Sequence, residues 1–145
     1  MDNYNNKGDN NNRILLVDDE IDITTIYTLG LQDNGFKVDA FNDPLQALSD
    51  FKSGSYDFVL IDYKMPKMNG FELYHEIRKV DAKVKICFVT AFDIYSGEMK
   101  KEFHRSSNGK YQDKEEDDSD IIKCFIQKPV GIDELVKRVK EQLNS

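Results

Sequence analysis

Residues 58–70 read FVLIDYKMPKMNG, and this stretch decides the fold class. Its first four residues, Phe58 to Ile61, are all apolar and show no alternation with polar residues. Such an unbroken run is typical of a strand that is buried on both faces, as in a parallel sheet covered by helices. The run ends at Asp62, so we expect a carboxylate directly at the carboxyl end of a buried strand.

Short apolar runs of the same kind recur along the chain and predict five strands, at 14–17, 37–41, 58–61, 85–89 and 122–126. Apolar residues at helical spacing lie between and after these runs, and Asp43 is a suitable cap for a helix that begins at Pro44. The predicted inner faces of the helices consist of Ile23, Ile26, Tyr27 and Leu31; of Leu45, Leu48 and Phe51; of Phe71, Tyr74 and Ile77; and of Ile132, Leu135, Val136, Val139 and Leu143. Five strands alternating with five helices predict an α/β fold, a doubly wound five-stranded parallel sheet with helices on both faces.

Two polar segments lie outside this alternation. Residues 1–12 are rich in Asn and have no apolar periodicity, so we predict a flexible N-terminal tail followed by one domain over 13–145. The second segment, at about 106–120, carries six closely spaced acids, which repel one another and favour a solvated acidic loop inserted into the domain. The alternative interpretation is an acidic element that docks a partner, or a second weak cation site.

Composition limits the function classes. The formal net charge is −7, which argues against nucleic acid or an anionic membrane as a direct partner. The N-terminus lacks a basic region followed by an apolar run, and no apolar segment is long enough to cross a bilayer. Cys87 and Cys124 lie in apolar stretches, which favours buried, reduced thiols and a cytoplasmic location.

Polar residues follow four of the predicted strands where each strand ends, namely Asp18 and Asp19, Asp62, Thr90 and Lys128. The carboxyl ends of parallel strands meet at one edge of the sheet, where ligands bind in this fold class. Carboxylates gathered there repel one another unless a cation neutralises them, and an all-oxygen ligand set favours Mg²⁺ over Zn²⁺. A lysine and a hydroxyl beside that metal suit an anion such as a phosphoryl group.

With these residues in place, the sequence resembles the receiver domain of two-component response regulators, the CheY-like family. The resemblance runs from about Arg13 to the end of the last predicted helix. It is carried by Asp18-Asp19, by Asp62 with Met65-Pro66 and Asn69-Gly70 after it, by Thr90-Ala91 and by Lys128-Pro129. The resemblance implies a flavodoxin-like sheet with strand order 2-1-3-4-5.

The resemblance also implies roles for the acids. Asp62 would be the phosphorylation site, taking a phosphoryl group from a histidine kinase or a histidine phosphotransfer protein. Asp19 and Asp62 would bind Mg²⁺ directly, Asp18 would act through a bound water, and the backbone carbonyl of Lys64 would complete the protein ligands.

For the remaining site residues, the resemblance implies a phosphoryl contact and a switch. Lys128 would pair with a phosphoryl oxygen, and the bond from Lys128 to Pro129 would be cis. Thr90 would move to hydrogen-bond the phosphoryl group, and Phe125 would then turn inward. The surface of the fourth helix, fifth strand and fifth helix would change shape and, with it, the choice of downstream protein.

The implied function is a phosphoacceptor that assists its own phosphorylation and dephosphorylation and is not otherwise an enzyme. We expect a single-domain regulator, monomeric or dimerising on phosphorylation; the receiver part of a longer protein is the alternative. A Mg²⁺-dependent phosphohydrolase with an aspartyl nucleophile is a second candidate, although Lys64 stands where such enzymes usually place a general acid. A receiver-like binding module that works without phosphorylation is the third.

Simpler interpretations exist for several of these residues. Asp18 or Asp19 could cap the following helix, and Asp62 could cap a turn. Phe125 could be a core aromatic with no switching role. We predict surface positions for His75, His104, Lys67 and Arg78.

Overall fold

The structure, a computed structural model, describes residues 12–91 and 124–145. The elements are β1 (Arg13–Val17), α2 (Ile21–Asp33), β2 (Lys37–Phe41), α3 (Pro44–Asp50), β3 (Phe58–Ile61), α4 (Gly70–Val80), β4 (Lys85–Thr90), β5 (Phe125–Gln127) and α7 (Ile132–Leu143). Several predicted features lie outside the described residues: the acidic loop, the fourth helix, His104, nearly all of the N-terminal tail and the first residues of the fifth strand.

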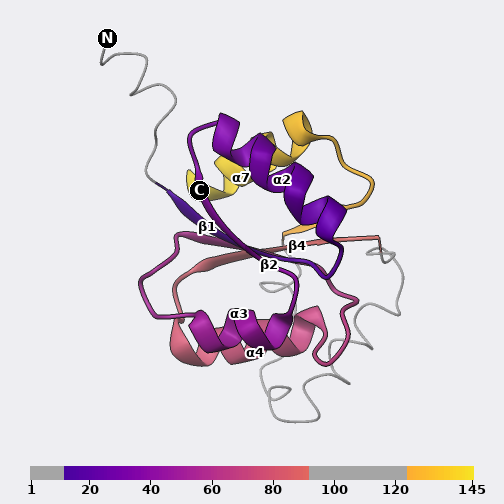
Figure 1. The fold of residues 1–145 in the computed structure, drawn as a ribbon. Coiled ribbons are helices and arrows are strands. Elements are labelled where there is room, and N and C mark those ends of the chain that lie inside the picture. The colour runs from indigo at the N-terminus through magenta and orange to yellow at the C-terminus, as the bar shows by residue number, and fades with distance from the viewer. Residues whose placement is uncertain (1–11, 92–123) are drawn as a thin grey trace.

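The described strands form one sheet in the order β2-β1-β3-β4-β5, and every neighbouring pair is parallel. Helices α2 and α7 cover one face of the sheet, and α3 and α4 cover the other (Figure 1). The predicted fold class and strand order are therefore confirmed. Among the described helices, none combines the length and the hydropathy that a bilayer span needs.

The central strand β3 is buried on both faces, as its unbroken apolar run predicts. Val59 and Ile61 belong to the core under α3 and α4, and Phe58 and Leu60 belong to the core under α2 and α7. All four side chains are 0% exposed. Because burial of one such side chain is worth about 1.5–3 kcal/mol, this strand anchors the position of the residue that follows it, Asp62.

Helix α4 begins with a capping box, which fixes the chain directly after the loop that follows β3. The Asn69 side chain accepts a hydrogen bond from the Glu72 backbone N–H, and the Glu72 carboxylate accepts one from the Asn69 N–H, each at 2.9 Å. The Gly70 N–H donates to the Tyr63 carbonyl at 2.8 Å, so the helix start is tied to the residue after Asp62.

Two residues predicted on inner helix faces are exposed instead. Ile26 is 52% exposed and Leu45 is 45% exposed. The inner face of α2 contains Tyr27, and Ile26 is offset from it by one residue, about 100° around the helix. The prediction from helical spacing alone therefore included Ile26, one residue beyond the edge of the buried face.

Two residues predicted at the surface are packed instead. His75 is 4% exposed, and burial lowers its pKa to about 4. The Arg78 guanidinium lies over the Tyr74 ring and donates hydrogen bonds to the Asp81 and Val84 carbonyls at the end of its helix. The Arg78 contacts are local, because its partners lie within six residues of it along the chain.

Lys67 is exposed, as predicted, and its Nζ lies 3.0 Å from a carboxylate oxygen of Asp43. The Asp43 side chain also accepts a hydrogen bond from the Leu45 N–H at 2.9 Å, and Pro44 opens α3, so the predicted cap is confirmed.

The prediction of reduced thiols is wrong, because Cys87 and Cys124 form a disulfide. The prediction of burial is right: the two residues are 0% and 4% exposed. Cys87 lies in β4 and Cys124 directly precedes β5, and their Cα atoms are 4.9 Å apart, within the range that a disulfide requires. Sequence spacing could not reveal this pairing, since it depends on the register of two strands that are far apart along the chain.

Candidate functional site

The carboxyl ends of β1, β3, β4 and β5 bring the predicted site residues together. Asp18 follows β1, Asp62 follows β3, Thr90 ends β4 and Lys128 follows β5. Backbone hydrogen bonds hold these ends in line: the Asp62 N–H donates to the Val17 carbonyl at 3.0 Å, and the Lys128 N–H donates to the Thr90 carbonyl at 2.9 Å.

Three acids form the floor of the site. Asp18, Asp19 and Asp62 each place one carboxylate oxygen within 4.8 Å of the others. Asp18 is 2% exposed and Asp62 is 7% exposed, so two of the three charges are shielded from water.

The ammonium group of Lys128 lies against these acids. Lys128 Nζ is 2.7 Å from Asp18 Oδ2, 3.6 Å from Glu20 Oε1 and 3.7 Å from Asp62 Oδ2. The peptide bond that follows this lysine, between Lys128 and Pro129, is cis.

Burial and crowded charge perturb the ionisation of the site. Burial raises the pKa of Asp62 to about 6, and the nearby Asp18 charge adds to the rise; Lys128 and a hydrogen bond with Thr90 oppose it. Burial likewise raises the pKa of Asp18, against its hydrogen bond with Lys128. For Lys128, burial is the largest influence and lowers the pKa, but the hydrogen bond with Asp18 and the negative charges of Asp62, Asp18 and Glu20 together outweigh it, so the pKa is raised.

The site therefore has more negative charge than its lysine neutralises. Its three clustered donors are carboxylate oxygens, with no Cys or His among them, which suits Mg²⁺. The acids that could hold the ion are Asp18, Asp19 and Asp62. Lys64 follows in the same loop with an exposed side chain.

Thr90 and Phe125 point into different surroundings. Thr90 is 1% exposed and hydrogen-bonds with Asp62, inside the site. The Phe125 ring is 8% exposed and stacks on Phe88 at a centroid distance of 5.0 Å, with Phe71 edge-on at 6.4 Å. In this structure Phe125 is packed as a core residue.

The sequence analysis missed one positioning residue, Asn42, and did not predict the steric role of another, Gly70. Asn42 Nδ2 donates to the Asp18 carbonyl at 2.7 Å and to Thr24 Oγ1 at 3.0 Å, and so fixes the end of β1. A side chain at Gly70 would collide with the backbone of Asp62 and Tyr63. Asn42 follows β2 directly, so the strand-end argument applied to the second strand would have found it.

The sequence matches the family model for the response regulator receiver domain over residues 14–140. The chain belongs to this family. Receiver domains are signalling domains of two-component systems rather than enzymes, and they work with histidine kinases or phosphotransfer proteins.

Curated relatives contain this receiver domain as one part. Hybrid signal transduction histidine kinase B of Dictyostelium discoideum is 32% identical over 138 residues, which cover 91% of this chain and 7% of that protein. The CpxR homolog of Haemophilus influenzae, a transcriptional regulatory protein, is 43% identical over 79 residues, covering 54% of this chain and 34% of the relative. The aligned residues thus span well under half the length of either relative.

Solved receiver structures have the same fold. A CheY-like receiver domain protein from Methanospirillum hungatei aligns with a TM-score of 0.72 and 26% identity, over 92% of this chain and 94% of that one. The response regulator TrrA from Thermotoga maritima, solved in complex with Mg²⁺ and BeF, aligns with a TM-score of 0.69 and 31% identity, over 90% and 98%. Receiver domains bind Mg²⁺ at an acidic pocket, and the cluster of Asp18, Asp19 and Asp62 in this chain suits that ion.

Proposed function

We propose that this receiver domain accepts a phosphoryl group on Asp62 from a histidine kinase or a histidine phosphotransfer protein, in a reaction that requires Mg²⁺. The observation that carries the proposal is the position of Asp62 beside two acids and a lysine: its carboxylate clusters with Asp18 and Asp19, and its Oδ2 lies 3.7 Å from Lys128 Nζ. Buried carboxylates that lie this close together destabilise the fold unless a bound ligand neutralises their charge.

The transfer makes Asp62 the nucleophile. One of its carboxylate oxygens attacks phosphorus, the bond from phosphorus to the donor imidazole nitrogen breaks, and the electron pair remains on that nitrogen. The product is an acyl phosphate on Asp62. Reactions of this kind depend on positioning and charge neutralisation more than on acid–base work.

The surrounding residues would position and neutralise. Mg²⁺ held by Asp18, Asp19, Asp62 and the Lys64 carbonyl would neutralise charge on the phosphoryl oxygens. Lys128 donates to Asp18 in this structure and would share its ammonium with a phosphoryl oxygen.

The donor would dock on the exposed side of α2. This helix begins at Ile21, three residues after Asp18, and it exposes Ile21, Ile26 and Leu29 by 66%, 52% and 58%. Apolar side chains at such exposure, beside a site that needs a protein donor, suit a protein surface.

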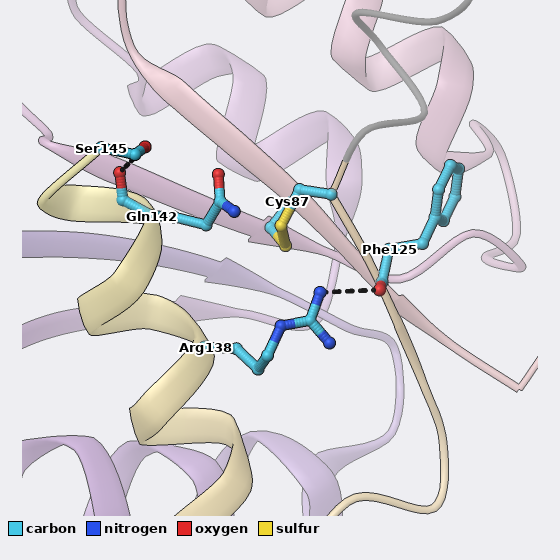
Figure 2. The surroundings of a disulfide bond; sticks show 6 residues. Cys87, Phe125, Arg138, Gln142 and Ser145 are labelled. Carbon is cyan, nitrogen blue, oxygen red and sulfur yellow. Dashed lines mark hydrogen bonds between the residues drawn. A yellow bond between two sulfur atoms is a disulfide. The ribbon is translucent and has the colours of Figure 1, made fainter.

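The output would pass through Thr90, Phe125 and the surface of β5 and α7. Thr90 hydrogen-bonds with Asp62, so a phosphoryl group there would compete for its hydroxyl. The Phe125 carbonyl accepts a hydrogen bond from Arg138 of α7 at 3.2 Å, which links the strand to the helix (Figure 2). A change in the packing of Phe125 would reach the outer surface by this link, as a shift between two populated states.

We further propose that the chain works in the cytoplasm, where ATP-dependent kinases supply phosphohistidine. The argument from reduced cysteines no longer supports this location, because the two thiols form a disulfide.

Acetyl phosphate and Mg²⁺ followed by intact mass measurement test the proposal. The wild type should gain the mass of one phosphoryl group, and should gain none with EDTA present or with Asp62→Ala. Asp33→Ala, which removes an exposed acid at the end of α2, is the control and should leave the gain unchanged. Steady release of phosphate with no added mass would indicate a phosphohydrolase. If the protein neither gains mass nor releases phosphate, it is a module that binds without phosphorylation.

A further inference from the structure

The disulfide ties an edge strand to its neighbour. β5 has three residues, stands last in the order of the described sheet and pairs with β4. Cys87 and Cys124 lie one residue before the paired Phe88 and Phe125, and the Phe88 N–H donates to the Cys124 carbonyl at 3.0 Å. The covalent bond therefore reinforces the pairing that holds β5 in place.

The bond lies on the opposite side of the strands from the aromatic stack. Cys87 and Cys124 belong to the core under α2 and α7, whereas Phe88 and Phe125 belong to the core under α3 and α4. In Figure 2 the Phe125 ring points away from α7, and Arg138 reaches from α7 to the Phe125 carbonyl on the side of the disulfide.

The clamped backbone also carries two groups of the phosphorylation site. Thr90 is three residues after Cys87, and Lys128 is four residues after Cys124. Any movement of β5 against β4 changes how Thr90, Phe125 and Lys128 lie relative to one another. The disulfide opposes that movement.

We propose that Cys87 and Cys124 form a redox-sensitive clamp on the phosphorylation switch. The oxidised pair holds β5 and Phe125 in place whether or not Asp62 carries a phosphoryl group, and reduction lets the strand respond. This inference rests on the proposed function of Asp62. Disulfides that form in the reducing cytoplasm are mostly transient, catalytic or redox-sensing, which matches a reversible clamp.

The reaction partner is a small disulfide such as oxidised glutathione. One protein thiolate attacks a sulfur of that disulfide, forms a mixed disulfide and releases one reduced glutathione. The second protein thiolate attacks the protein-bound sulfur, forms the bond between Cys87 and Cys124 and releases the second glutathione. Two protein thiols lose two electrons and two protons, and one small disulfide is reduced to two thiols.

Burial sets the route by which the pair reacts. Cys87 is 0% exposed and Cys124 is 4% exposed, so a small thiol reaches them when β5 opens locally. Edge strands open at lower free energy than the whole domain unfolds. Thiol–disulfide exchange at Cys87 and Cys124 should therefore proceed in the native protein, but more slowly than in the unfolded chain.

Hydrogen exchange on the full chain tests the clamp. The protein is prepared with oxidised glutathione or with dithiothreitol, and non-reducing peptide masses establish whether Cys87 and Cys124 are joined. Exchange over residues 125–138 is then measured with and without Mg²⁺ and beryllium fluoride. In the reduced protein the ligand should change this exchange, and in the oxidised protein the change should be about tenfold smaller, because the cross-link removes the entropy gained on opening.

The variant with both Cys87→Ala and Cys124→Ala should respond like the reduced wild type in either buffer; if it does not fold, the comparison of the two wild-type forms stands alone. Equal ligand-induced changes in the oxidised and reduced proteins, or no disulfide after treatment with oxidised glutathione, would overturn the clamp. If Mg²⁺ and beryllium fluoride bind neither form, calorimetry shows it directly, and then the proposed function fails and the clamp with it. Binding to both forms with equal responses rejects the clamp alone.

Discussion

Lys128 Nζ lies 2.7 Å from Asp18 Oδ2, although 110 residues separate the two along the chain. The same nitrogen is 3.7 Å from Asp62 Oδ2. The lysine is therefore held by the acid beside Asp62, the proposed phosphorylation site, rather than by Asp62 itself. This leaves Asp62 underneutralised, and a divalent ion would supply the missing positive charge.

Replacement of Lys128 should destabilise the fold. Lys128→Met leaves Asp18 buried without its ammonium partner, and we expect the free energy of unfolding at pH 7 to fall by about 3 kcal/mol. Lys79→Met is the matched control, because it removes a half-exposed lysine paired with Glu76 at 3.0 Å and should cost under about 1 kcal/mol. Urea unfolding gives both values, and equal losses would mean that the buried pair has no special weight.

The acidity of Asp62 should appear in the pH dependence of stability. Its pKa rises from 3.8 to about 6 on folding, so the folded state keeps the proton longer. Stability is then lost as the pH rises from about 4 to about 6, and the full cost is present above that range. Without metal at pH 7.5, Asp62→Asn should be more stable than the wild type by about 3 kcal/mol.

The comparison is made by urea unfolding in EDTA, at pH 7.5 and at pH 4. The advantage of Asp62→Asn should shrink to a small fraction of its value at the lower pH, because Asp62 of the folded wild type is then protonated and carries no buried charge, and the unfolded state, with a pKa of 3.8, is partly protonated as well. A variant that is less stable than the wild type at pH 7.5 would contradict the assignment of a raised pKa to Asp62.

Gly70 should matter for the site through its lack of a side chain. A methyl group there would meet the Asp62 carbonyl and the Tyr63 backbone, so Gly70→Ala must displace the loop that begins at Asp62. We expect the free energy of unfolding to fall by about 1–3 kcal/mol and phosphoryl uptake from acetyl phosphate to become slower. Gly131→Ala is the control, since a methyl group there meets nothing within 4 Å, and its effect should stay below about 1 kcal/mol.

The exposed apolar residues of α2 should affect transfer from a protein donor alone. Ile26→Ser and Leu29→Ser should each slow transfer from a phosphorylated kinase or phosphotransfer protein by about tenfold, while uptake from acetyl phosphate is unchanged. Val80→Ser is the control: Val80 is 45% exposed and ends α4, about 15 Å along the helix from the end beside Asp62. Equal rates for all three variants would place the donor elsewhere.

The strand-end acids and the sheet could be predicted because both follow from local patterns. An apolar run that ends at Asp62 or Asp18 identifies a strand and its polar end at once, and parallel strands bring such ends together. The disulfide and the burial of His75 depend on which distant segments lie side by side, information that no local pattern carries. Asn42 directly follows the second strand, so its place among the strand ends could be predicted, but the hydrogen bond of its amide to the end of β1 could not.

The central claim is that Asp62 is the phosphorylated residue. Phosphorylation with acetyl phosphate and Mg²⁺, followed by borohydride reduction, converts an aspartyl phosphate into homoserine, which peptide mass spectrometry locates. We expect homoserine at position 62, in an amount that falls when Asp19→Asn weakens the Mg²⁺ site. Homoserine at another aspartate, or an equal yield at position 62 without Mg²⁺, would contradict it.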